Sequence, residues 1–332
     1  MNMRQFTRII LHDMSPFHIG KGRDFYDLSE QAVSSDSLSA ALAALRAQTG
    51  KTEDIEDFLN SFELSSAFPY SHEHYFLPRL SGRINVYIPQ QDEATYRKQL
   101  KHIKYIETNL WRQLTSSPKP VAINKAQICG SYLLGSVDLD FNPPIATAVT
   151  QRVKVPREDG LDAEPFYFQW NYVNPDAGLY CLLRCDAPLK DEIIQLFEAL
   201  GEAGFGSDKN IGGGHFKVEA KDIEVEMPQD GNAQVVLSTY IPTNDEIQSL
   251  NLLKSRYDLK KIGGFMAGSN EEEFRHLHRK SIYAFNTGSV FATTATLAGR
   301  IVDLSPDWNS GKMHPVWRSG KAITLILSYN YE

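Results

Sequence analysis

The chain has 332 residues, which suits about two domains and a substantial core. Its hydrophobic content of 42% and charged content of 23% are those of an ordinary globular protein. No apolar run is long enough to span a bilayer, and the N-terminus lacks the continuous apolar core of a signal peptide, so no membrane partner is expected. The net charge of −7 opposes a nucleic-acid partner on average, but binding depends on local patches, and basic residues lie apart from the acidic clusters near Glu53, Glu224 and Glu271.

The three cysteines, Cys129, Cys181 and Cys185, are odd in number and lack metal-binding spacing. Cys181 and Cys185 fall on one predicted strand, so their Cα atoms would be roughly 13 Å apart. That separation is too large for a disulfide. A chain without a disulfide framework is expected in the cytoplasm.

The first part of the chain predicts a strand over residues 5–11 and two amphipathic helices. Ser35 and Asp36 are N-cap candidates for the first helix, which carries Leu38, Ala41, Leu42 and Leu45 and ends before Gly50. The second helix is indicated by apolar residues spaced i, i+3, i+4 and i+7, namely Ile55, Phe58, Leu59 and Phe62.

A short strand is expected around residues 84–88, followed by a long helix over residues 95–114. The apolar stripe of this helix is Leu100, Ile103, Ile106, Leu110 and Leu114. Its first part is purely basic, with Arg97, Lys98, Lys101 and Lys104. On periodicity alone, a solvated face is the simpler interpretation of these charges.

Residues 146–156 predict an extended arm with Arg152 and Lys154 on one side. A turn over residues 157–160, which begins with Arg157, would lead to a returning strand over residues 166–170. This pattern is typical of a projecting hairpin. Residues 178–185 then predict a buried strand.

Residues 204–216 contain five glycines in thirteen positions. An amphipathic helix over residues 190–200 precedes them, and an alternating strand follows from Phe216. Consecutive free amides, with Lys209 and His215 alongside, would suit a phosphate chain, whereas a helix C-cap followed by a flexible turn explains the glycines equally well. The pattern is neither a Walker loop nor a dinucleotide fingerprint. The order helix, loop, strand occurs in ferredoxin-like and RNA-recognition folds.

A second unit is predicted to start near residue 231, so the expected domains are 1–230 and 231–332. It opens with a strand over residues 233–241, and Thr243 with Glu246 forms a capping box for a helix through Ile247, Leu250 and Leu253. The chain ends in an alternating strand over residues 321–331. Both units mix strands and helices without a βαβ rhythm, which favours an α+β fold with antiparallel sheets.

Candidate chemistry is sparse. No nucleophilic triad is visible, and the pairs His72/His74 and His276/His278 lack a third ligand, so neither a metal site nor a cofactor is expected. His18 and His215 each adjoin glycine and a basic residue, which would suit acid–base cleavage of RNA or, as the preferred interpretation, contact without catalysis. The basic, aromatic segment 314–321, with Trp317, Arg318 and Lys321, is expected to contact nucleic acid or a partner, or to be a packed turn.

Taken in order, several segments resemble the RAMP superfamily of CRISPR proteins, and the closest match is the fourth Csm subunit of type III-A effector complexes. The matching segments occur in family order and are spread over nearly the whole chain. They are His18-Ile19-Gly20-Lys21-Gly22, Ser34-Ser35-Asp36-Ser37-Leu38, Phe76-Leu77-Pro78-Arg79, Lys101-His102-Ile103-Lys104-Tyr105-Ile106, the glycine loop ending Gly214-His215-Phe216, and His314-Pro315-Val316-Trp317-Arg318-Ser319-Gly320-Lys321.

The resemblance implies two ferredoxin-like (RRM-like) domains and a noncatalytic subunit that holds the repeat-derived 5′ tag of the crRNA. It also implies the partners: the large polymerase–cyclase subunit and a backbone RAMP subunit. The hairpin near residues 146–170 resembles the family's thumb. The family's loop usually ends Gly-Arg-Phe, and His215 in place of arginine removes a fixed positive charge.

The expected RNA-binding residues combine the basic segments with the glycine loop. They are His18, Lys21, Lys98, Lys101, Arg152, Lys154, Arg157, Gly204, Gly206, Lys209, Gly212, Gly213, Gly214, His215, Phe216, Arg318 and Lys321. Two alternatives remain open: a Cas6-type endoribonuclease that uses His18 or His215, and the equivalent tag-binding subunit of a type III-B complex.

Overall fold

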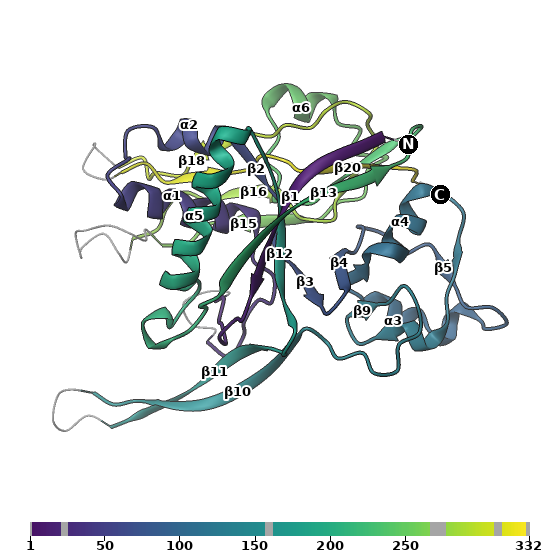
Figure 1. Cartoon of the computed structure of the whole chain (residues 1–332), viewed down its shortest axis with the longest axis horizontal. Helices are drawn as coiled ribbons and strands as arrows, with labels where there is room; N and C mark the ends of the chain where they lie inside the picture. Colours follow the sequence, from purple (N-terminus) through teal and green to yellow (C-terminus); the bar gives the residue numbers. More distant parts are fainter. Residues whose placement is uncertain (1, 21–25, 157–161, 266–276, 309–313, 330–332) are drawn as a thin grey trace.

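A long antiparallel sheet runs through the middle of the molecule (Figure 1). The computed structural model describes residues 2–20, 26–156, 162–265, 277–308 and 314–329, and within these the sheet has nine strands. Their order is β13 (Lys217–Met227), β1 (Asn2–His12), β12 (Ala177–Cys185), β3 (Phe68–Ser71), β4 (His74–Pro78), β6 (Tyr105–Glu107), β9 (Tyr132–Leu133) and β8 (Ile128–Cys129), with β2 (Phe62–Leu64) also paired to β12. The pairing of β6 with β9 is the parallel one in this sheet.

Helices cover one face of this sheet. They are α1 (Ser35–Gln48), α2 (Ile55–Asn60) and α5 (Ala187–Ala203). Ile9 and Leu11 of β1 point into the helical layer, where they share a core with Leu42 and Phe197. Side chains alternate along a strand, so Phe6 and Ile10 of the same strand face the other side. The middle of the sheet is therefore buried on both faces.

Burial on both faces explains why β12 reads as a continuous apolar run rather than an alternating one. Leu179, Cys181 and Leu183 pack under the helices, while Tyr180 and Leu182 pack on the opposite side. The strand predicted over residues 178–185 is confirmed. Cys129, Cys181 and Cys185 are free cysteines in the structure.

The strand and the two amphipathic helices predicted for the first part of the chain are present, with two changes at the helix ends. The N-cap of α1 is Ser34, and Ser35 and Asp36 already lie in its first turn. The helix α2 ends at Asn60, so Phe62 is not its last apolar residue but starts strand β2. Phe62 still packs against Phe58, with ring centroids 5.1 Å apart, because both belong to the same core.

The long helix predicted over residues 95–114 is wrong in its middle. The chain instead forms η1 (Glu93–Thr95), α3 (Arg97–His102), β6 and α4 (Thr108–Ser116). Tyr105 and Ile106 pair with Pro78 and Leu77 of β4 on one side and with Tyr132 and Leu133 of β9 on the other. Short elements complete this region: β5 (Val86–Tyr87), β7 (Val121–Ala122) and η2 (Lys125–Gln127).

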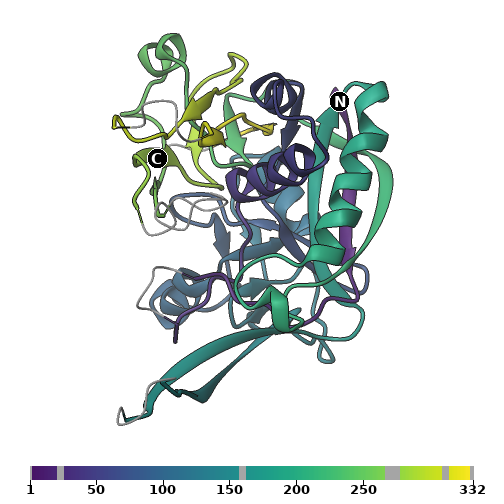
Figure 2. The ribbon, with the colours of Figure 1, turned by 90° about the vertical axis from the view of Figure 1, so that its left-hand side faces the viewer.

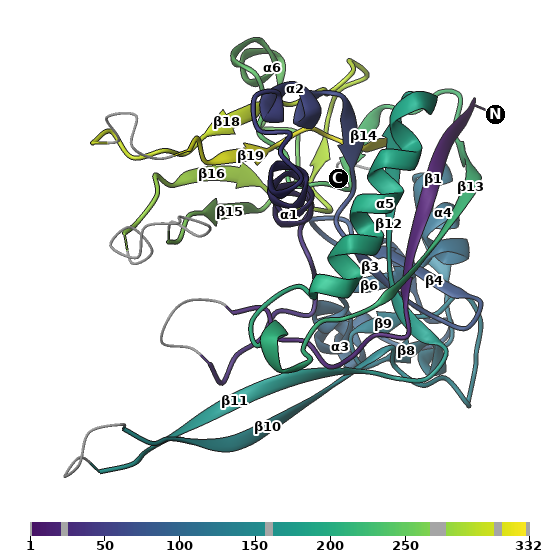
Figure 3. The same cartoon turned by 60° about the vertical axis from the view of Figure 1, so that its left-hand side comes forward.

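A two-stranded hairpin projects from the molecule, as the sequence predicts (Figure 1). It consists of β10 (Ile145–Lys154) and β11 (Glu164–Val173), with Arg152 opposite Phe166 and Thr150 opposite Phe168. The expected turn over residues 157–160 lies outside the described residues. The hairpin extends from the same side as the C-terminal strand pairs described next (Figure 3).

The C-terminal part is built from small antiparallel sheets. They are β17 (Val290–Phe291), β14 (Ala233–Val236) and β20 (Thr324–Leu327); β15 (Leu259–Ile262) with β16 (Ile282–Phe285); and β18 (Ile301–Asp303) with β19 (Trp317–Ser319). The capping box of Thr243 and Glu246 is confirmed at the start of α6 (Asn244–Ser249). This helix stops before its predicted end, because Leu250 is extended and Leu253 lies almost fully in solvent.

The two parts of the chain pack together through a common core. Val235 and Leu325 of the C-terminal sheet contact the same apolar cluster as Phe6, Ile10 and Leu182 of the central sheet. On the helical side, α1 lies between α5 and the C-terminal strands (Figure 2). Among the described helices, none is long and apolar enough to cross a membrane.

Candidate nucleic-acid interface

The glycine loop between α5 and β13 is held in one conformation by backbone packing. Gly206 has a φ of +82° and a Cβ at this position would stand 2.3 Å from the His18 carbonyl oxygen. Gly214 has a φ of +71°, and its Cβ would stand 2.1 Å from the carbonyl oxygen of Phe205. Glycine is therefore required here by the protein's own backbone.

Many amides of the loop donate hydrogen bonds within the protein. Ser207 donates to the carbonyl of His18 at 2.9 Å, Gly214 donates to that of Pro16 at 2.9 Å, and Phe205 donates to that of Gly214 at 3.1 Å. The Gly213 amide donates to the carbonyl of Asp208 at 3.2 Å. These four amides are not free to hold a phosphate chain, which favours the C-cap and turn interpretation of the glycines.

The inner face of the hairpin is fastened to this loop. Arg152 forms an ion pair with Asp208, with Nη1 and Oδ2 2.6 Å apart. The same guanidinium lies over the ring of Phe168 at 4.0 Å and near that of Trp170 at 5.3 Å. A Cβ on Gly213 would stand 3.1 Å from the Trp170 ring. Arg152 therefore holds the hairpin against the loop.

Two of the expected contact residues lie inside the protein. His18 is 1% exposed, its Nδ1 is 2.8 Å from the carbonyl oxygen of Gln169, and its ring packs against that of Phe168 with centroids 4.4 Å apart. Phe216 is buried in the core beneath α5. His215 is half-buried, and its Nε2 lies 3.4 Å from the carbonyl oxygen of Lys209. These side chains support the loop from beneath.

The solvent-facing cations lie on three different elements. Lys98 and Lys101 are exposed on α3, Lys154 is exposed near the free end of the hairpin, and Lys209 is exposed on the loop. Gly212 is exposed as well, with open space where a Cβ would be. Gly204 is buried at the C-cap of α5 with a φ of +73°. Lys21 and Arg157 lie outside the described residues.

The basic segment before the last strand is built into the structure. Lys321 donates a hydrogen bond to the carbonyl of Asn60. Burial is the main cause that lowers the pKa of Lys321. Arg318 is half-buried on β19, and its pKa is lowered to about 10 by burial first and by the charge of Arg279 second. Neither cation extends freely into solvent.

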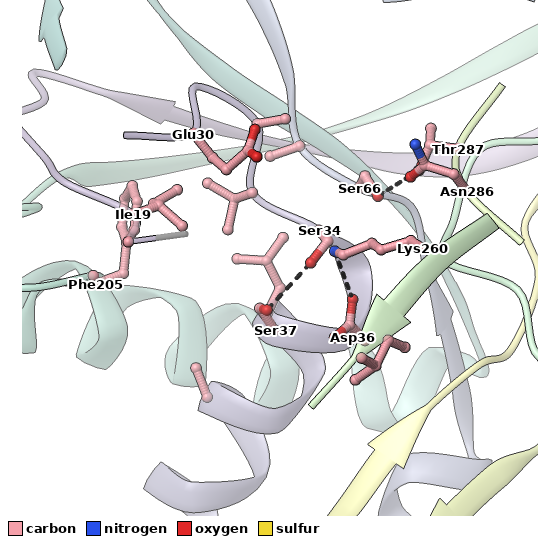
Figure 4. A pocket seen from close by; sticks show the side chains of 18 of the residues that line it. Ile19, Glu30, Ser34, Asp36, Ser37, Ser66, Phe205, Lys260, Asn286 and Thr287 are labelled. Atoms are coloured by element: carbon pink, nitrogen blue, oxygen red, sulfur yellow. Dashed lines mark hydrogen bonds and ion pairs between the residues drawn. The ribbon is translucent and has the colours of Figure 1, made fainter. Parts of the chain in front are cut away.

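A cavity of about 1080 Å³ lies between the glycine loop and the C-terminal strands (Figure 4). Gly204, Gly206 and Lys209 line it from the loop, and β15 lines it from the opposite side. Among the described residues, six cations and two carboxylates line it. They are Arg79, Lys104, Lys209, Lys260, Lys261 and Arg279, with Glu30 and Asp36.

Lys260 and Arg279 are not among the residues that the sequence predicts for the site. They are 19 positions apart and more than 200 residues beyond Asp36, so no local pattern brings them together. Lys260 and Lys261 both lie on β15, and both line the cavity.

Asp36 is the buried carboxylate at the base of this cavity. It is 3% exposed, accepts a hydrogen bond from Thr239 Oγ1 at 2.9 Å, and lies 3.6 Å from Lys260 Nζ. Burial opposes ionisation, but the charge of Lys260 and the hydrogen bonds from Ser34 and Thr239 outweigh it, so the pKa of Asp36 is lowered.

Metal chemistry finds no support in the described ranges, where no group of three His, Cys, Asp or Glu side chains is placed to hold an ion. His74, of the first histidine pair, lies between two carboxylates. Its Nδ1 is 3.3 Å from Glu107 Oε1 and its Nε2 is 3.4 Å from Asp138 Oδ2. His276, of the second histidine pair, lies outside the described residues.

Comparison with known proteins agrees with this architecture. The family model described as "CRISPR Csm4 C-terminal domain" matches residues 229–327. The chain is 22% identical over 274 residues to the Csm4 protein of Thermococcus onnurineus (strain NA1), which covers 80% of this chain and 85% of that protein. It is 24% identical over 297 residues to Csm4 of Streptococcus thermophilus, covering 87% and 89%.

Solved structures show the same fold. A chain in the crystal structure of a Csm1–Csm4 cassette in complex with cA4 has a TM-score of 0.59 and 18% identity, and the match covers 98% of this chain and 99% of that one. A chain in the Csm3–Csm4 subcomplex of a type III-A interference complex has a TM-score of 0.57 and 16% identity, covering 97% and 99%.

The fold and these matches make the chain similar to subunits of CRISPR effector complexes. The resemblance that the sequence indicates is confirmed. Over most of its length the chain is similar to Csm4, and its residues 229–327 match the model of the Csm4 C-terminal domain.

Proposed function

We propose that this chain is the noncatalytic subunit of a type III-A Csm complex that holds the repeat-derived 5′ tag of the crRNA. We further propose that it bridges the large polymerase–cyclase subunit and the backbone subunits. The observation that carries the proposal is that the hairpin, the glycine loop and a cation-lined cavity lie together in a protein similar to Csm4. Csm4 relatives are seen with Csm1 and with Csm3, which supports the two protein partners.

Within this function we assign direct RNA contacts to the exposed cations Lys98, Lys101, Lys154 and Lys209 and to the open Gly212. Their separation along the chain fits a strand of RNA that follows several elements. His18 and Phe216 would act from beneath by fixing the loop. Arg152 would fix the hairpin above it.

The endoribonuclease alternative finds less support. A general acid or base has to reach the reacting oxygen, whereas the imidazole of His18 is buried and hydrogen-bonded to the carbonyl of Gln169. We therefore expect no cleavage of repeat RNA by the purified chain. Metal-independent, site-specific cleavage that disappears in His215→Ala would favour the nuclease instead.

We infer two ferredoxin-like units divided near residue 231. The order β13-β1-β12-β3, with α1 between β1 and β2 and α5 between β12 and β13, fits a β-α-β-β-α-β unit for the first. The family match beginning at residue 229 supports the boundary. Three free cysteines fit the cytoplasm.

The test is the affinity for a tag oligonucleotide at physiological salt, measured with and without the co-expressed large and backbone subunits. Because a net charge of −7 opposes RNA binding, the lone chain should bind weakly and with strong salt dependence, and the partners should add tight retention. Equal, tight affinity in both preparations would show that the chain carries a complete site. No affinity in either would overturn the proposal.

A further inference from the structure

A second cavity, of about 310 Å³, lies at the seam between the two parts of the chain. It shares no lining residue with the larger cavity between the glycine loop and the C-terminal strands. Its walls come from the segment before β5, from the end of α4 with the segment after it, and from residues of the C-terminal part. They are Leu80, Arg83, Ile84, Asn85, Ile106, Leu114, Ser117, Pro118, Pro120, Arg256, Ser328 and Tyr329.

The floor of this cavity is apolar. Ile84, Ile106 and Leu114 are buried there and belong to the core that the two parts share. The rings of Pro118 and Pro120 add to the wall on the side of α4. A nonpolar group that enters the cavity therefore leaves water for contact with the common core of the molecule, which is favourable.

The walls of the cavity are held in place by hydrogen bonds. Asn85 donates from Nδ2 to the carbonyl of Pro118 at 2.8 Å, which ties the segment before β5 to the end of α4. The Ser328 amide donates to the carbonyl of Thr115 at 2.7 Å, which ties the C-terminal part to the same helix. A cavity that is already held open costs little conformational entropy when it is filled.

The rim of the cavity carries positive charge. Arg83 and Arg256 line it, and among the described lining residues there is no carboxylate. Lys119 is exposed between the two lining prolines. Arg83 is exposed and forms an ion pair with Glu93, which lies outside the lining. Cations around an apolar hollow complement an apolar group that is flanked by carboxylates.

The position of the cavity favours a protein occupant over RNA. Its floor is aliphatic, whereas sites for single-stranded RNA hold bases on aromatic faces. The helix α4 lies on the side of the molecule away from the projecting hairpin (Figures 1 and 3). Backbone subunits continue along the RNA, which we place on the hairpin and the glycine loop. The side of α4 is therefore left to the large subunit.

We propose that this cavity is a docking pocket into which the large polymerase–cyclase subunit inserts an apolar side chain flanked by carboxylates. The apolar side chain contacts Ile84, Ile106 and Leu114, and the carboxylates pair with Arg83 and Lys119 at the rim. The inference rests on the proposed bridging function, because it names the surface by which the chain holds the large subunit. An apolar anchor in a preformed pocket is the kind of contact that dominates the energy of a protein interface.

The first experiment fills the cavity. Ser117 lines it, whereas the neighbouring Ser116 is exposed and does not. Each hydroxyl makes a local hydrogen bond: Ser116 Oγ donates to the carbonyl of Arg112 at 2.7 Å, and Ser117 Oγ accepts from the amide of Lys119 at 3.2 Å. Ser117→Leu should weaken the affinity of the full-length chain for the large subunit at least about tenfold, and Ser116→Leu should bind as the wild type does.

A second pair of variants keeps the test independent of how Ser117→Leu folds. Arg83 and Arg112 are both exposed and both paired with a glutamate, but only Arg83 lines the cavity. Arg83→Glu and Arg112→Glu change the net charge equally, so a general effect of charge would appear in both. Arg83→Glu alone should weaken binding of the large subunit about tenfold, and the loss should shrink at high salt. Both variants should keep the Tm of the wild type, because exposed ion pairs contribute little to stability.

The occupant is identified with a photo-crosslinking benzoylphenylalanine in place of Lys119 in the complex with both partner subunits. The expected crosslink joins this position to an apolar segment of the large subunit that has acidic neighbours. A crosslink to RNA or to the backbone subunit would overturn the inference. Normal binding of the large subunit by both Ser117→Leu and Arg83→Glu would reduce the cavity to a packing gap and leave the tag-binding function standing. Failure of the wild-type chain to bind the large subunit would overturn the proposed bridging function itself.

Discussion

Single glycines of the loop 204–216 serve two different purposes. Gly214 packs its Cα hydrogen against the Phe205 carbonyl, whereas Gly212 faces open space. Both have positive φ, at +71° and +94°. The difference between them is therefore the close approach of the backbone at Gly214, which no side chain permits.

The two glycines allow a matched test. Gly212→Ala should cost about 1 kcal/mol of unfolding free energy from its left-handed backbone alone. Gly214→Ala adds a clash with the Phe205 carbonyl and should cost several-fold more. Urea unfolding of both variants measures the difference, and equal costs would mean that the loop shifts to accommodate a methyl group.

Arg152 is a second residue whose role is decided by its contacts. Its ion pair with Asp208 is partly exposed, so breaking it should cost only up to about 1 kcal/mol of global stability. Arg152→Lys keeps the charge but loses the planar contact with Phe168, so amides of β10 and β11 should exchange hydrogen faster. Lys154→Ala, at the exposed end of the same strand, is the control. Unchanged exchange in Arg152→Lys would show that charge alone fastens the hairpin.

At the scale of elements, α6 depends on its cap. The Thr243 hydroxyl accepts from the Glu246 amide at 3.2 Å, and Glu246 accepts from the Thr243 amide at 2.8 Å. Thr243→Ala should cost about 1 kcal/mol, and Thr243→Ser should cost little because the hydroxyl remains. Thermal unfolding of the two variants tests this, and a loss of equal size in both would assign the effect to the lost methyl group.

Local periodicity was sufficient for α1, α5, β12 and the hairpin, because each has the 3.6- or 2-residue pattern of its own element. It was insufficient for β6. Tyr105 and Ile106 fit a helical stripe in sequence, but they pair with strands that lie before and after them in the chain. Pairing between distant segments overrides a helical pattern and leaves no local signal.

The candidate site shows the same limit. The glycine loop was recognisable as a loop, but only the folded chain shows that its amides bond to Pro16 and His18 and that Asp36 meets Lys260.

For the whole molecule, Asp36 links the two parts of the chain. It lies on α1 and contacts Thr239 and Lys260, which belong to the C-terminal part. Asp36→Ala removes the buried hydrogen bond to Thr239 and the ion pair with the partly exposed Lys260, and should cost roughly 1–3 kcal/mol.

The pKa of Asp36 is lower in the folded state than in the unfolded state. The contribution of Asp36 to the free energy of unfolding is therefore complete above the pKa of the unfolded state, about 4. It is lost as the pH falls through the pKa of the folded state. Unfolding measured from pH 7 to pH 3 should show a smaller loss in Asp36→Ala than in the wild type. Parallel curves would contradict the linkage.

The common core also has a consequence for synthesis on the ribosome. Phe6, Ile10 and Leu182 emerge long before Val235 and Leu325, which cover them. Until the last hundred residues arrive, the nascent chain lacks the part of this core that Val235 and Leu325 supply, and the apolar surface left exposed favours association with other chains. A stop codon after residue 230 would make that transient state permanent. The truncated product should collect in the insoluble fraction, even though it contains the complete helical layer.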